Sequence, residues 1–164
     1  MASGSSYVLQ YRRKRTGKTN YKRRLNLLKS GRNRLVVRPT GKHIRVQLVE
    51  YGSDGDKILS QAHSSMLKKH GYNGSTSNTP AAYLTGLLCA VHSGGGDASL
   101  DLGLKDSVTG SKIYAAVKGA VDGGLNVACH QEMFPKEERI KGGHSKTDAD
   151  NFESVKQAIL KSKK

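Results

Sequence analysis

Apolar and polar positions alternate in three short runs early in the chain. In the second run, Ile44, Val46 and Leu48 alternate with polar residues, which is the period of a strand that buries one face. Turn-forming residues at 39–41 and 52–55 separate the three runs. The sequence therefore predicts an antiparallel meander of three strands, at residues 34–38, 43–50 and 57–63.

Helical periods and short strands alternate in the second half of the chain. The segment 81–91 is apolar on nearly every face, which predicts a buried helix that begins at Pro80 with Thr79 as its N-cap. We also expect a fourth strand at 99–104, a helix at 112–122, a short fifth strand at 125–128, irregular structure at 131–147, and a last amphipathic helix around Phe152, Val155 and Ile159. The order strand, helix, strand predicts a parallel pair within the sheet.

Together these elements predict an α/β fold. It is a single domain with a mixed sheet, in which an antiparallel three-strand meander is followed by β-α-β-type units and flanked by helices. We divide the chain into a basic N-terminal arm and helix (1–30), an α/β domain (31–130), and a C-terminal extension with a final helix (131–164).

Charge is distributed very unevenly along the chain. Residues 1–49 contain 14 Lys and Arg and no Asp or Glu, whereas the remainder contains 14 Lys and Arg against 13 acids. Such a segment repels itself until a polyanion neutralises it, which favours nucleic acid as the partner. A membrane is disfavoured, because no apolar run approaches the roughly 18 residues of a span and the N-terminus lacks the order of a signal peptide.

A short helix is predicted at 19–29, within this cationic segment. Tyr21, Leu25 and Leu28 form one apolar stripe along it. We expect the helix to dock through this narrow seam and to present Lys22, Arg23, Arg24 and Lys29 elsewhere.

Other chemistry finds little support in the residues. Gly17-Lys18-Thr19 ends like a phosphate-binding P-loop, but position 12 is Arg where that motif needs Gly. Asp54 and Asp56 fit a hairpin turn better than a calcium loop, and Cys129-His130 lacks the further ligands of a zinc site. No nucleophile elbow or paired-carboxylate signature is present. We therefore expect no enzyme activity, no metal and no cofactor.

Cysteine usage is sparse. Cys89 lies in the apolar 81–91 segment, where it is typical of a small core residue, and Cys129 is the second cysteine. This favours a reducing compartment.

Several ordered motifs resemble a known family. Residues 12–21 (RRKRTGKTNY), 34–38 with 42–44, 77–88 (SNTPAAYLTGLL), 100–104, 110–112, 118–125, 134–135 and 138–144 occur in the order typical of the 5S-rRNA-binding large-subunit ribosomal proteins. These are the archaeal and eukaryotic relatives of bacterial large-subunit protein eighteen, and the length is similar to the archaeal members. The resemblance implies a cytoplasmic protein in the central protuberance of the large subunit. Its partners would be 5S rRNA, large-subunit rRNA and neighbouring ribosomal proteins, with no membrane and no small-molecule substrate.

Charge and resemblance together suggest which residues contact RNA. We expect contacts from Arg12, Arg13, Lys14, Arg15, Lys18, Tyr21, Lys22, Arg23 and Arg24; from Arg38, Lys42, His43 and Arg45; from the loop Asn73, Gly74, Ser75, Thr76, Ser77 and Asn78; and from a smaller patch of Arg139, Lys141 and His144. Tyr7, Tyr11, Tyr21 and Tyr72 could stack on unpaired bases, whereas we expect Tyr83 to pack inside.

Two other functions remain open at this point. A DNA-compacting architectural protein would bind duplex DNA as well as RNA. A nucleotide-using enzyme would depend on Gly17-Lys18-Thr19 alone.

Overall fold

A five-stranded mixed sheet forms the centre of the protein. The computed structural model describes residues 4, 6, 8–143 and 149–162. The strand order is β3-β2-β1-β4-β5, with bounds β1 Asn33–Pro39, β2 Ile44–Gly52, β3 Gly55–His63, β4 Gly96–Asp101 and β5 Leu125–Val127. Strands β1, β2 and β3 are antiparallel neighbours, while β4 is parallel to β1 and β5 to β4. The predicted meander, mixed sheet and parallel pair are confirmed.

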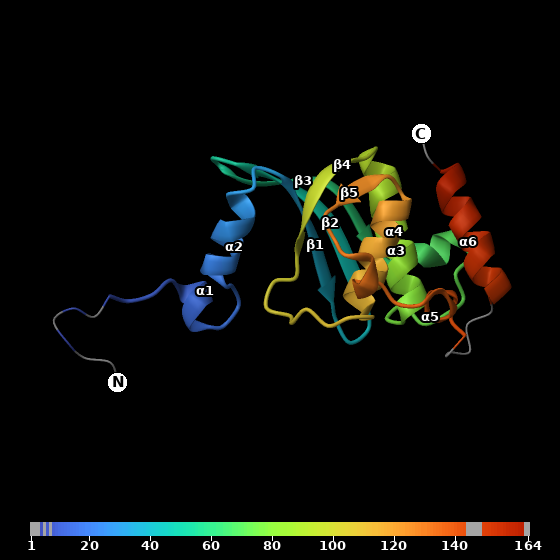
Figure 1. The fold of residues 1–164 in the computed structure, drawn as a ribbon, viewed down its shortest axis with the longest axis horizontal. Coiled ribbons are helices and arrows are strands. Elements are labelled where there is room, and N and C mark those ends of the chain that lie inside the picture. Colours follow the sequence, from blue (N-terminus) through green and yellow to red (C-terminus); the bar gives the residue numbers. More distant parts are fainter. Residues whose placement is uncertain (1–3, 5, 7, 144–148, 163–164) are drawn as a thin grey trace.

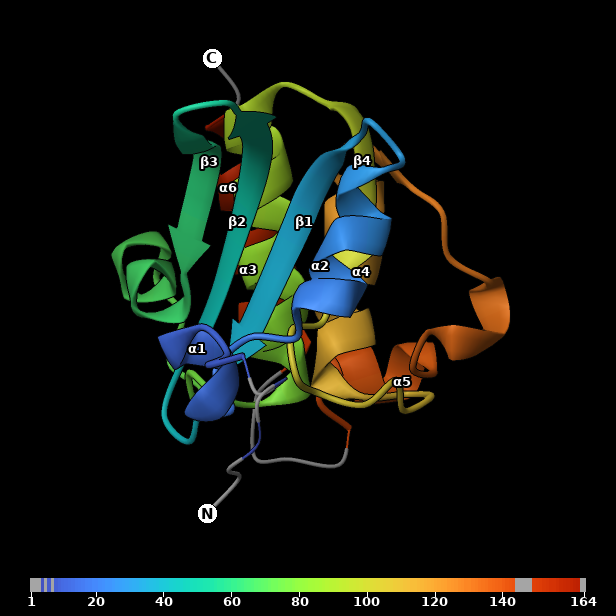
Figure 2. The same ribbon diagram turned by 90° about the vertical axis from the view of Figure 1, so that its left-hand side faces the viewer.

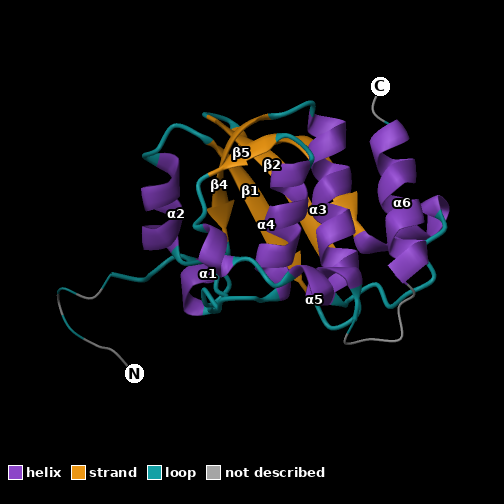
Figure 3. Ribbon diagram, turned by 45° about the vertical axis from the view of Figure 1, so that its right-hand side comes forward, coloured by secondary structure: helices purple, strands orange, loops and turns teal. Residues whose placement is uncertain are grey.

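Helices lie on both sides of this sheet (Figures 1 and 3). Their bounds are α1 Arg12–Arg15, α2 Tyr21–Leu28, α3 Thr79–Ser93, α4 Lys112–Asp122, α5 Glu137–Lys141 and α6 Ala149–Lys161, with 3₁₀ helices at Ser64–His70 and Gln131–Met133. Helices α3 and α4 cover one face, α6 packs outside α3, and α2 lies on the opposite side of the sheet (Figure 1). The Ser64–His70 helix was not predicted.

The face under α3 and α4 holds the core. Leu35, Val37 and Val46 are fully buried there, as strand alternation requires. Every residue of α3 from Thr79 to Val91 is buried, which confirms the helix predicted from its apolar faces. Cys89 is among them, and burial raises the pKa of its thiol.

The start of α3 corrects the predicted cap. Asn78, not Thr79, is the N-cap, and its side-chain oxygen accepts a hydrogen bond from the Ala81 N–H at 2.9 Å. Thr79 is the first helical residue and Pro80 the second, where a missing N–H leaves no helical bond unmade.

Helices α3 and α4 touch through their backbones. A Cβ on Gly86 would lie 1.9 Å from the Ala116 carbonyl oxygen, and one on Gly119 would lie 2.0 Å from the Tyr83 carbonyl oxygen. Any larger residue at either glycine would push the helices apart. These two glycines therefore set the distance between α3 and α4.

Two positions differ at the predicted boundaries. Strand β4 spans 96–101 rather than 99–104, because the chain turns at Gly103, whose φ is +64°. The segment 131–147 is not wholly irregular, since it contains α5 and a 3₁₀ turn; residues 144–148 lie outside the described residues.

The C-terminal helix is part of the packed body. Phe152, Val155 and Ile159 are buried on α6, as their spacing predicts. The Phe152 ring lies 5.5 Å from that of Tyr83, and Tyr83 donates a 2.7 Å hydrogen bond to Asp122. Tyr83 thus packs inside, as expected.

Candidate nucleic-acid interface

The N-terminal arm presents its cations to solvent. Arg12, Arg13, Lys14, Arg15 and Lys18 are all exposed. The first four form the single helical turn α1, after which Gly17 adopts a φ of +60°. The Arg13 Nε donates to the Thr19 hydroxyl at 2.8 Å, which closes this turn back on itself. Gly17-Lys18-Thr19 therefore follows a helical turn rather than the strand that a P-loop requires.

Helix α2 docks on the sheet differently from the prediction. The prediction that α2 docks through an apolar seam is wrong, because Tyr21 is 36% and Leu25 is 53% exposed and no residue of α2 is buried. Polar contacts hold the helix instead. One Nη of Arg23 donates to the Gly103 and Lys105 carbonyl oxygens at 3.0 and 3.1 Å.

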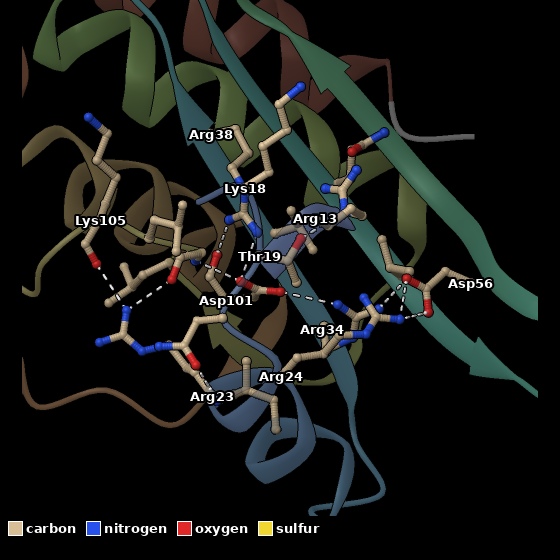
Figure 4. Close-up of a pocket in the computed structure, with 18 of the residues that line it drawn as sticks. Arg13, Lys18, Thr19, Arg23, Arg24, Arg34, Arg38, Asp56, Asp101 and Lys105 are labelled. Atoms are coloured by element: carbon tan, nitrogen blue, oxygen red, sulfur yellow. Dashed lines mark hydrogen bonds and ion pairs between the residues drawn. The ribbon is translucent and has the colours of Figure 1, made fainter. Parts of the chain in front are cut away.

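A chain of alternating charges crosses the open face of the sheet (Figure 4). Its members, which we call the arginine–aspartate ladder, are Arg24, Asp56, Arg34, Asp101 and Arg38. Asp56 lies 2.8 Å from an Arg24 nitrogen and 2.6 Å from an Arg34 nitrogen. Asp101 lies 3.1 Å from Arg34 and 2.8 Å from Arg38. The ladder joins α2, β3, β1 and β4.

Arg34 is the buried centre of this ladder, with 3% of its surface exposed. Its close contact to Asp56 does not have hydrogen-bond geometry and acts as an ion pair. Its Nε–H has no acceptor within the described residues. A buried cation is tolerable here because two carboxylates flank it.

Both aspartates of the ladder remain ionised well below neutral pH. Burial alone would raise the pKa of Asp56, but the ion pair with Arg34 and the hydrogen-bonded ion pair with Arg24 outweigh burial and lower it. For Asp101, burial is likewise outweighed, here by Arg38, the Gly103 N–H and Arg34, so that its pKa is also lowered.

A cleft of about 450 Å³ lies between the arm with α2 and the open face of the sheet. Basic side chains line this cleft, which we call the cationic cleft, and Val36 and Ile58 contribute apolar surface. The basic residues that line it are Arg13, Lys18, Arg23, Arg24, Arg34, Arg38 and Lys105 (Figure 4). The ladder therefore forms part of its wall.

The structure joins the β1–β2 turn to the loop at 73–78. The Thr76 hydroxyl donates to the Lys42 carbonyl oxygen at 2.7 Å, and the Asn73 N–H donates to the Asn151 side chain at 3.2 Å. Asn73 and Ser75 are exposed, whereas Gly74, Thr76, Ser77 and Asn78 are half-buried. Asn78 caps α3 and accepts from the Tyr72 hydroxyl, so it has a structural role of its own.

Next to this turn lie two histidines. The rings of His43 and His63 are 4.7 Å apart, and burial together with the charges of His43 and Arg45 lowers the pKa of His63. Arg45 is exposed and pairs in register with Arg38 across the β1–β2 hairpin.

The tyrosines divide into accessible and inaccessible ones. Tyr11 and Tyr21 are exposed, with ring centroids 5.5 Å apart. Tyr72 is only 2% exposed, so the prediction that it stacks on bases is wrong. Tyr7 lies outside the described residues.

The smaller C-terminal patch lies on α5. Arg139 and Lys141 are exposed, and the Lys141 ammonium is 3.9 Å from Glu153; His144 lies outside the described residues. In Figures 1 and 2, α1, the β1–β2 turn and α5 lie toward the same end of the molecule.

Sequence reasoning missed the acidic half of this interface. The sequence pattern places Asp56 in a turn and gives Arg34 no role beyond its strand. Period-two alternation puts Arg34 and Arg38 on one strand face, which was the available signal. Their aspartates come from other strands, and the pairing of Val36 with Asp101 is not visible in a single sequence.

The described part of the chain has neither a metal-binding cluster nor a membrane-spanning helix. No cluster of three or more His, Cys, Asp or Glu side chains there could hold a metal ion. None of the described helices combines the length and apolarity needed to cross a bilayer.

Comparison with known proteins decides the family. A family model described as "Ribosomal large subunit proteins 60S L5, and 50S L18" matches residues 5–94 and 93–130. The chain belongs to this family.

Archaeal relatives agree with this assignment. The large ribosomal subunit protein uL18 of Methanothermobacter thermautotrophicus is 49% identical over 88% of this chain and 77% of that protein. The uL18 of Methanobrevibacter smithii is 44% identical over 99% and 86%, and that of Methanococcoides burtonii is 45% identical over 98% of each. The chain is therefore a structural constituent of the large ribosomal subunit, with rRNA and ribosomal proteins as partners, rather than an enzyme.

Proposed function

We propose that this protein binds 5S rRNA and helps to anchor it in the central protuberance of the large subunit, with further contacts to large-subunit rRNA. The observation that carries the proposal is the placement of the acid-free segment 1–49, most of whose 14 cations reach solvent on the arm, α2 and the β1–β2 hairpin. Each phosphate that such cations neutralise releases counterions and strengthens binding. The resemblance to the 5S-rRNA-binding members of the family supplies the identity of the RNA.

The division of work within the chain follows from this placement. In the proposal, residues 1–30 act as the RNA-binding arm and helix, 31–130 as the body that aims them, and 131–164 as an extension. The arm cations contact phosphates directly. Arg23 and Arg24 contribute partly by holding α2 in place, because Arg23 is hydrogen-bonded to the Gly103 carbonyl oxygen and Arg24 to the Asp56 carboxylate.

The remaining contacts belong to the same end of the molecule. Lys42 and His43 lie in the β1–β2 turn that is hydrogen-bonded to the 73–78 loop, and Arg139 with Lys141 adds a second cationic patch. The exposed rings of Tyr11 and Tyr21 are available to stack on unpaired bases.

A competition experiment tests the proposal. Full-length protein is titrated against labelled 5S rRNA transcript in a filter-binding assay at several salt concentrations. Unlabelled 5S rRNA, an unrelated folded RNA of equal length and duplex DNA serve as competitors. We expect 5S rRNA to compete at least about tenfold better than either control. Equal competition by duplex DNA would favour an architectural DNA-binding protein instead.

A further inference from the structure

The guanidinium of Arg38 is held in one orientation from three sides. Its Nη1 donates to the carbonyl oxygens of Val37 and Asp101 at 3.0 and 2.6 Å, and its Nη2 donates to the Asp101 carboxylate at 2.8 Å. The Asp101 carboxylate is itself fixed, because it also accepts the Gly103 N–H at 2.7 Å and faces Arg34. A side chain restrained in this way loses little further freedom when it binds a ligand.

Gly103 packs against the guanidinium of Arg38. A Cβ at position 103 would lie 2.8 Å from Arg38 Cζ and 3.0 Å from its Nε and Nη2. The guanidinium therefore lies against the bare Cα of this residue, a place that a larger residue would fill. Despite these contacts, 39% of the Arg38 side chain remains exposed.

The hydrogen bonds leave one edge of Arg38 unused. A guanidinium has five N–H donors in a fixed planar fork, and three of those of Arg38 are engaged by protein oxygens. Within the described residues, nothing accepts from its Nε–H or from the second hydrogen of Nη2. These two donors form one edge, whose spacing matches two oxygens of a phosphate.

The surroundings of Arg38 also favour an anion. Arg13 and Lys18 line the same cationic cleft from the arm (Figure 4), and neither forms an ion pair within the described residues. Arg34, which is buried in the cleft wall, has an Nε–H without an acceptor. The ladder itself contains three arginines but two aspartates, so it keeps an excess positive charge.

We propose that the cationic cleft is a seat for one backbone phosphate of the bound RNA, that Arg38 grips this phosphate with its Nε–Nη2 edge, and that Asp101 is the positioning residue for Arg38. This inference rests on the proposed function in taking RNA as the ligand. It adds that an acidic residue inside a cationic surface strengthens RNA binding, through the orientation of its partner.

The principal test exchanges Arg38 for lysine, which keeps the charge but removes the planar edge. In filter binding with the full-length protein, Arg38→Lys should weaken RNA binding about tenfold while leaving the salt dependence of the affinity unchanged. Arg32→Lys is the matched control, because Arg32 is exposed and is not among the residues that line the cationic cleft. It should bind nearly as the unchanged protein does. Equal affinity of Arg38→Lys and the unchanged protein would overturn the proposal.

The assay separates this inference from the proposed function. A phosphate carries no sequence information, so Arg38→Lys should weaken binding to 5S rRNA and to a folded control RNA by the same factor. If the unchanged protein failed to prefer 5S rRNA, the proposed function would be lost. An equal loss on both RNAs would still support the phosphate seat.

Asp101→Asn tests the positioning role. Removing a negative charge from a cationic surface should by itself tighten RNA binding, whereas a disordered Arg38 should weaken it several-fold. Asp54→Asn, in the exposed β2–β3 turn, removes an acid that pairs with no arginine of the described ranges and should not weaken binding. If Asp101→Asn does not fold by circular dichroism, Gly103→Ala takes its place, because its Cβ displaces the same guanidinium. Undiminished binding by the folded variant would contradict the role of Asp101.

Discussion

On one face of the sheet, α3 and α4 cover Leu35, Val37 and Val46 so completely that none of these side chains reaches solvent. On the other face, α2 packs beside β4 without burying a single residue of its own. Apolar packing determines the first layer, and ion pairs and carbonyl contacts determine the second. One sheet therefore separates stability from binding, because moderate salt screens surface charges but changes apolar packing little.

The largest contrast should come from the packed side. Phe152→Ala removes a ring that is 2% exposed against Tyr83, and we expect it to lower the free energy of unfolding by about 4 kcal/mol. Chemical denaturation measures this loss. Leu160→Ala is the control on the same helix, since Leu160 is 43% exposed and should change stability by less than about 0.5 kcal/mol. Similar losses for both variants would mean that α6 is not part of the core.

A somewhat smaller loss is expected where the two covering helices touch. Gly119→Ala places a methyl group 2.0 Å from the Tyr83 carbonyl oxygen, so α3 and α4 must separate. The expected cost in unfolding free energy is about 3 kcal/mol, even though alanine favours a helix. Gly41→Ala introduces the same methyl group where nothing lies within 4 Å. A thermal melt in which both variants behave alike would contradict the close contact.

Substitutions among the exposed cations of the arm should change RNA binding without changing the stability of the fold. Replacing Arg12 and Lys14 together with Gln should leave the melting temperature unchanged, because both residues are exposed and their side chains form no hydrogen bond or ion pair within the described residues. The slope of log affinity for 5S rRNA against log salt should become shallower by about 1.5. Lys68 and Lys69, exposed on the 3₁₀ helix, provide a matched double replacement that should leave this slope unaltered. An equal change in both pairs would mean that net charge, not placement, governs binding.

The smallest expected effect is the loss, at low pH, of the stability that the arginine–aspartate ladder contributes. Because the folded protein lowers the pKa values of Asp56 and Asp101, the unfolded chain takes up protons first as the pH falls. The stability that the ladder contributes is therefore complete above the unfolded pKa of about 4 and is lost as the pH drops through the lower folded values. Urea titrations between pH 5 and pH 2 should show this decline. Asp56→Asn should make the decline shallower, whereas Asp54→Asn should follow the unchanged protein.

The sequence by itself determined which segments bury one face and which carry charge. Strand period and the apolar surface of α3 are local properties, and both predictions are confirmed by the structure. The position of α6 followed from the spacing of Phe152, Val155 and Ile159 for the same reason. Local spacing failed at α2, where Tyr21 and Leu25 form a stripe that the body does not cover.

Only the tertiary structure decided which cations are available for RNA and which hold the protein together. Arg34 and Arg38 have the same side-chain chemistry and lie four residues apart, yet one is buried and the other faces the cleft. Both pair with Asp101, 67 and 63 residues further along the chain, which reaches them because β4 pairs with β1. Of the two, Arg34 also pairs with Asp56. Periodicity describes neighbours within one element. A contact across strands depends on how the whole sheet assembles, so the partner of a charge is a property of the fold.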